Sequence, residues 1–95
     1  MPCYFIGEVD VRDPEGYRAY ADAVPPLLEK YGGRFLVKGG PTLRLEGFAP
    51  QARIALVEFP DMETAQAFWN SDEYQAIAMI RNRTAVARAF LVDGI

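Results

Sequence analysis

Extended and helical segments alternate along the 95 residues in one order: strand, helix, strand, strand, helix, strand. Runs rich in aromatic and branched residues, which favour strands, fall at residues 3–11, 34–47, 53–59 and 86–92. Apolar residues at three- and four-residue steps, typical of helices, fill residues 14–31 and 62–82. This order predicts an α+β, ferredoxin-like βαββαβ fold, whose antiparallel sheet carries its helices on one face. Residues 1–95 are too few for a second core, so we predict one domain.

The segment boundaries carry recognisable signals. Asp61 and Ser71 are good N-caps, so the second helical region is predicted to restart at Ser71. The pair Pro25-Pro26 lies inside the first helix, but the apolar stripe keeps its phase across it, which favours a kinked continuation. Gly32-Gly33 is predicted to end that helix. Gly39-Gly40 interrupts the second strand, which predicts a bulge there or the close approach of another backbone or ligand.

Both faces of the predicted strands are apolar. One face is assigned Phe5, Val9, Phe35, Val37, Ile54, Leu56, Ala89 and Leu91, and the other Tyr4, Ile6, Leu36, Ala55, Val57, Phe59, Phe90 and Val92. A slip of one residue would reverse the faces of a strand. One layer of helices covers only one face, so the surplus predicts a partner on the other face, most simply a second copy in a two-fold homodimer.

Composition excludes several functional classes. The net charge of −3 argues against a nucleic-acid partner. Histidine is absent and Cys3 is the only cysteine, so we expect no intrachain disulfide, no metal site of the usual zinc, haem or copper type, and an inert thiol. Phosphate-loop and dinucleotide motifs are absent too, so no cofactor is expected. The first ten residues resemble neither a signal peptide nor a membrane span, which makes a cytoplasmic protein the default expectation.

Glu58 is the candidate general base. It shares a strand face with Ile54 and Leu56, and an apolar environment raises the pKa of a carboxyl toward a useful range. The alternative is a structural ion pair with a cation, for which the candidates are Arg34, Lys38, Arg53 and Arg88.

A second set of candidates lies on the third helix. Tyr74, Ala78 and Arg81 are four and three residues apart, so they share a face. With the backbone donors at the cap residue Ser71, this face could hold a small anion such as a carboxylate. In the alternative interpretation the tyrosine packs on the sheet and the arginine pairs with an acidic neighbour. Four other aromatic residues of the helices are expected to fill the core: Tyr17, Tyr20, Phe68 and Trp69.

Three segments together resemble a known family: "GGRFLVKGG", then "LEG", then "ALVEFPDMETAQAFWNSDEYQAI", with Arg81 a little later. The chain is similar over almost its whole length to the uncharacterised bacterial family DUF1330. This resemblance implies a dimeric α/β barrel in which two ferredoxin-like protomers pack sheet against sheet. It carries no activity with it. Enzymes of the same architecture often use histidine, which this chain lacks, and Lys38 stands where arginine is common, which weakens bidentate carboxylate binding but keeps the charge.

The sequence therefore predicts a homodimer that binds, with or without transforming, a small organic acid or carbonyl compound. Glu58 would be the base and Tyr74 a hydrogen-bond donor. The predicted substrate-binding residues are Arg34, Lys38, Ser71 and Arg81. One competing hypothesis is a non-catalytic dimeric module whose charged strand residues fix the register of two sheets. Another is a monooxygenase without a cofactor.

Overall fold

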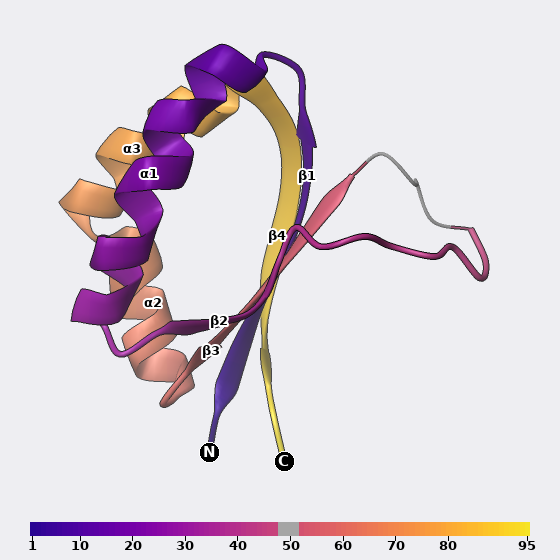
Figure 1. Ribbon diagram of the computed structural model, residues 1–95. Coiled ribbons are helices and arrows are strands. Elements are labelled where there is room, and N and C mark those ends of the chain that lie inside the picture. The colour runs from indigo at the N-terminus through magenta and orange to yellow at the C-terminus, as the bar shows by residue number, and fades with distance from the viewer. Residues whose placement is uncertain (48–51) are drawn as a thin grey trace.

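The computed structural model describes residues 1–47 and 52–95 (Figure 1). Its elements are β1 (Cys3–Val11), α1 (Pro14–Lys30), β2 (Arg34–Lys38), β3 (Arg53–Phe59), α2 (Met62–Asn70), α3 (Asp72–Thr84) and β4 (Ala85–Asp93). The strands form an antiparallel sheet in the order β2-β3-β1-β4. All three helices lie on one face of the sheet and leave the other face open (Figure 1). The predicted ferredoxin-like fold is confirmed.

The helices begin and end where the sequence places the signals. The side chain of Asp61 accepts a hydrogen bond from the Thr64 amide at 2.7 Å, which satisfies a free donor at the start of α2. Helix α1 continues through Pro25-Pro26 to Lys30, as its unbroken apolar stripe predicts. Gly32 follows this helix at a φ of 75°, in the left-handed region that glycine adopts without a steric penalty.

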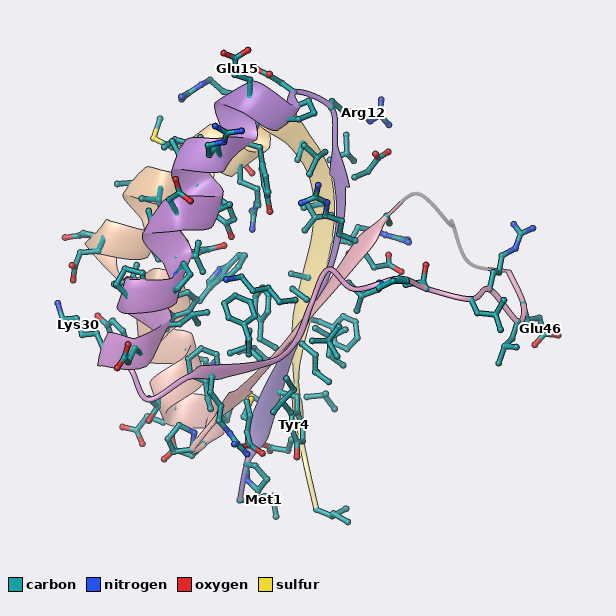
Figure 2. All side chains as sticks on the ribbon, in the orientation of Figure 1. Met1, Tyr4, Arg12, Glu15, Lys30 and Glu46 are labelled. Atoms are coloured by element: carbon teal, nitrogen blue, oxygen red, sulfur yellow. The ribbon has the colours of Figure 1, made fainter. Side chains whose placement is uncertain are left out.

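The second strand is shorter than predicted. Strand β2 ends at Lys38, and residues 39–47 form an extended arm that leads away from the body of the protein, with Glu46 far from the helices (Figure 2). The register of β2 on β3 shifts between Phe35 and Val37, so the irregularity lies before the glycine pair rather than at it. Residues 48–51, between the predicted second and third strands, lie outside the described residues.

The predicted sheet faces are right for β1 and β4 but reversed for β3. Antiparallel partners share a face, and Phe5 lies opposite Val57 while Ile6 lies opposite Leu56. Val57 is buried against the helices, so Leu56 lies on the open face. The assignment was wrong because every residue of this strand except its two charged ones is apolar, which leaves no alternation to read. Val37 also changes face, because the register shift precedes it.

Candidate functional site

A cavity of about 220 Å³ lies between the helices and the sheet. Its floor is hollow because small residues form one row across three strands: Gly7 of β1 lies opposite Ala55 of β3 and Ala89 of β4. Side chains of the helix layer point into the same space (Figure 2). Large apolar residues close the walls, namely Phe5, Val24, Leu28, Phe35, Val57 and Phe68. The cavity is therefore apolar over most of its surface and wide enough for a small molecule.

Three polar side chains form a connected cluster in the cavity wall. The hydroxyl of Tyr20, from α1, lies 2.9 Å from the hydroxyl of Tyr74, from α3. Arg81 donates from Nη1 to the Tyr74 hydroxyl at 2.8 Å. Tyr74 and Arg81 are seven residues apart, which is two helical turns, so both side chains project from the same face of α3. Their position on one face of α3 agrees with the spacing in the sequence, and the ligand role predicted for them stays a prediction.

The tyrosine hydroxyls remain neutral. Burial, with the neighbouring Tyr74, raises the pKa of Tyr20 far above its ordinary value. The pKa of Tyr74 is also raised, again mainly by burial, while Tyr20 and Arg81 oppose the shift. Both residues therefore keep their protons across the physiological range and act as hydrogen-bonding groups rather than as bases.

Arg81 is held in place but incompletely paired. Its guanidinium lies 5.6 Å from the ring centroid of Trp69 and 5.9 Å from that of Tyr20. Nη2 donates to Asn82 at 3.2 Å, while Nε is buried and has no hydrogen-bond partner. Within residues 1–47 and 52–95 no carboxylate forms a salt bridge with Arg81. Arg81 therefore brings to the cavity wall a positive charge that no described carboxylate neutralises, which favours an anionic ligand.

The other predicted site residues divide between the cavity, a helix cap and the open face. Lys38 lines the cavity, with Nζ 5.0 Å from the ring centroid of Phe35. Ser71 caps α3 through its side chain, which accepts from the Tyr74 amide at 3.1 Å, and it does not line the cavity. Lys38 thus joins Tyr74 and Arg81, and Ser71 serves the helix instead.

Glu58 and Arg34 lie on the open face of the sheet, away from the cavity. Arg34 donates to the Glu58 carboxylate at 2.8 Å, and the Tyr4 hydroxyl lies 3.5 Å from the other carboxylate oxygen. The Glu58 side chain is 26% exposed and that of Arg34 is 70% exposed. The expected apolar pocket around Glu58 is not found, because the face that it shares with Leu56 is the open one. The ion pair with Arg34, which was the alternative, is present.

Sequence reasoning missed three residues that line the cavity: Tyr17, Tyr20 and Arg53. The two tyrosines were assigned to the core on their helical spacing alone. A usable signal was present, since a buried hydroxyl needs a hydrogen-bond partner and two tyrosines occur in one apolar stripe. Arg53 was considered only as a partner for Glu58, because the predicted face of its strand was reversed.

Residues 1–47 and 52–95 hold no group of three or more acidic or cysteine side chains arranged to bind a metal ion. In the same part of the chain, no helix has the length and apolar character that crossing a membrane requires.

Several solved structures share the fold at low sequence identity. A protein of unknown function from Rhodopseudomonas palustris superposes with a TM-score of 0.78 at 20% identity, over 99% of this chain and 82% of the other. SnoaB, a cofactor-independent oxygenase from Streptomyces nogalater, superposes with a TM-score of 0.71 at 12% identity, over 99% of this chain and 93% of SnoaB. A dimeric ferredoxin-like protein of unknown function from Bacteroides fragilis superposes with a TM-score of 0.67 at 16% identity, over 98% of this chain and 96% of the other.

No curated protein matches the sequence. Residues 2–95 match the family described as Domain of unknown function (DUF1330), in agreement with the resemblance seen in the sequence. Because this match spans almost the whole chain, the protein belongs to the DUF1330 family.

Proposed function

We propose that the protein is a homodimer that binds a small organic acid, or a related carbonyl compound, in the cavity between its helices and its sheet. Arg81 binds the acidic group or the carbonyl oxygen, and the Tyr20–Tyr74 hydroxyl pair orients it. The observation that carries the proposal is the position of Arg81, a cation on the wall of a mostly apolar cavity that pairs with no carboxylate among the described residues. A carboxylate suits this donor because Arg forms short, charge-assisted hydrogen bonds with planar acceptors.

The shape and chemistry of the cavity limit the rest of the ligand. A volume of about 220 Å³ is below the roughly 300–1,000 Å³ of typical ligand pockets, which favours a single small ring or a short chain. Aromatic rings line it from five elements, with Phe5 on β1, Tyr17 and Tyr20 on α1, Phe35 on β2, Phe68 on α2 and Tyr74 on α3. An aromatic or apolar body with one acidic group therefore fits better than a sugar or a nucleotide.

Binding is better supported than catalysis. Glu58, the residue expected to act as the base, lies on the opposite face of the sheet and is paired with Arg34. Among the described residues that line the cavity there is no carboxylate to replace it. A general base must reach the proton that it removes, so the present arrangement favours a binding protein.

The open face of the sheet supports the dimer. It presents Phe90 at 59% exposure, Val86 at 58% and Val92 at 42%, all from β4, as well as Val37 at 38% from β2. The solved structure with this fold from Bacteroides fragilis is itself described as dimeric. A second copy placed sheet to sheet would cover these side chains, whereas a monomer would expose them to water.

A second candidate function is a dimeric module without a ligand. The Arg34–Glu58 pair favours it, because a charged pair among apolar residues of an interface can fix the register of two sheets. This hypothesis predicts that the cavity binds nothing and that only the dimer depends on the charged residues.

Isothermal titration calorimetry with benzoate tests the proposed function. Benzoate should bind the wild-type protein, and Arg81→Gln should weaken binding by about 10-fold or more, since a charge-assisted hydrogen bond is lost. Arg83→Gln is the matched control, because it removes the same charge from an exposed position on the same helix. Benzamide, which has the same ring without the charge, should bind more weakly than benzoate. Equal affinities of the Arg81→Gln and Arg83→Gln variants for benzoate would refute the proposal.

A further inference from the structure

The cavity lining is richer in basic residues than the acidic composition of the chain suggests. Lys38, Arg53 and Arg81 line it, and so does Arg88, which is paired with Glu8. The chain has 13 acidic and 10 basic residues, yet no acidic side chain appears among the described residues of the lining. The four salt bridges found in residues 1–47 and 52–95 engage Arg12, Lys30, Arg34 and Arg88. Three cations therefore face the cavity without a carboxylate.

Two of these cations lie together on the sheet. Lys38 of β2 is opposite Ala55 of β3, and Arg53 is two residues before Ala55, so Lys38 and Arg53 are diagonal neighbours on the cavity face. The β-carbons of such neighbours are about 7–8 Å apart, within reach of two long side chains. Lys38 Nζ lies over the Phe35 ring, and neither Lys38 nor Arg53 forms a salt bridge with a described carboxylate. An anion bound between the two side chains would be attracted by both positive charges.

The backbone supports this arrangement. Gly39 has a φ of 71°, and a β-carbon there would lie 3.6 Å from Cδ of Arg53. The aliphatic part of Arg53 thus passes over the Gly39 backbone, close to Lys38. The amide of Gly39 also donates to the Ile54 carbonyl at 2.9 Å, which ties the end of β2 to β3 beside both cations.

The Lys38–Arg53 pair is a different place in the cavity from Arg81. The pair comes from the sheet and both residues are exposed, whereas Arg81 comes from α3 and packs between the rings of Trp69 and Tyr20. Tyr17 is within electrostatic reach of both places: burial and Tyr20 raise its pKa, while Arg53 and Arg81 each lower it. A ligand that extends past Tyr17 would meet one cationic group at each end.

We infer that the ligand carries two acidic groups joined by a short apolar or aromatic body, with one group at Arg81 and the other between Lys38 and Arg53. This inference rests on the proposed function and narrows it from organic acids in general to dicarboxylic acids or related dianions. The two subsites differ in character. The Arg81 subsite is largely enclosed and sets orientation, and the Lys38–Arg53 subsite lies at the open side of the cavity and selects the second charge.

Calorimetry at low ionic strength, with benzoate and three dicarboxylates of different spacing, tests the inference. The probes are isophthalate, terephthalate and the flexible adipate. At least one dicarboxylate should bind on the order of 10-fold tighter than benzoate, because its second carboxylate interacts with two exposed cations. The double variant Lys38→Gln/Arg53→Gln should lose this advantage, so that the ratio of dicarboxylate affinity to benzoate affinity falls to about one.

The control is Arg44→Gln/Arg83→Gln, which removes two positive charges from residues that do not line the cavity. It should retain the preference for the dicarboxylate. The inference is overturned when no dicarboxylate binds more tightly than benzoate, or when the advantage survives in the Lys38→Gln/Arg53→Gln variant. Failure of the proposed function gives a different result, because benzoate itself would then bind independently of Arg81.

Discussion

Replacing Tyr74 with phenylalanine keeps the ring in the core and removes only the hydroxyl at the centre of the polar cluster. Tyr74 is 1% exposed, so water cannot substitute for the lost group. The change deprives the Tyr20 hydroxyl of its partner, which costs about 1 kcal/mol, and Arg81 of an acceptor, which costs about 1–2 kcal/mol because the guanidinium is only partly buried. We therefore expect the free energy of unfolding to fall by about 2–3 kcal/mol.

Two further variants should lose less stability than Tyr74→Phe and serve as comparisons. Tyr20→Phe breaks only the hydrogen bond between the two hydroxyls, so it should cost about 1 kcal/mol. Tyr31 packs edge-on against Phe68, and its hydroxyl makes no hydrogen bond to any described residue, so Tyr31→Phe should cost less than about 0.5 kcal/mol. Urea denaturation at one fixed protein concentration measures all three, because the stability of a dimer depends on concentration. A loss for Tyr74→Phe no larger than that for Tyr31→Phe would refute the reasoning.

Three other perturbations test separate parts of the structure. Gly33→Ala should lower the free energy of unfolding by about 1–3 kcal/mol, because the new β-carbon would lie 2.8 Å from the Phe59 ring. Gly40→Ala should be nearly neutral, because no atom lies within 4 Å of the β-carbon that it adds. Hydrogen bonds from Thr64 lower the pKa of Asp61 in the folded state, so its stabilising effect is present above the unfolded pKa and is lost as pH falls through the folded one. Asp61→Asn should therefore lose less stability than wild type between about pH 5 and pH 2, and identical pH profiles would contradict this. Glu58→Gln should weaken the dimer severalfold in analytical ultracentrifugation and leave the affinity for benzoate unchanged. A lower affinity for benzoate with an intact dimer would show instead that Glu58 takes part in ligand binding.

The order of the elements was predictable because local signals determine it. Asp61 and Ser71 act as caps, and Gly32 has the positive φ that ends a helix, all of which depend on neighbours within a few residues. The pairing of Tyr74 with Arg81 was predictable for the same reason, since helical spacing alone places them on one face.

The composition of the site was less predictable because it depends on which strand face meets the helices. Strand β3 is apolar on both sides, so nothing in its sequence told Leu56 from Val57. This reversal placed Glu58 in the predicted pocket and removed Arg53 from it. The partner of Tyr74 on α1 was also hidden, since the contact between Tyr20 and Tyr74 joins residues 54 positions apart. Such contacts follow from the packing of two helices and not from any local pattern.

The central claim is that Arg81 binds an organic anion in the cavity, and a titration followed at the Nε–H group of that residue tests it most directly. Two-dimensional ¹H–¹⁵N NMR detects arginine Nε–H groups, and the Arg81→Gln variant identifies the signal by its disappearance. On addition of benzoate, the Arg81 signal should shift to saturation, because a carboxylate bound to the guanidinium changes the environment of its Nε–H group. The Arg83 signal should remain in place. An Arg81 signal that does not respond to benzoate, or shifts equal to those of Arg83, would contradict the account.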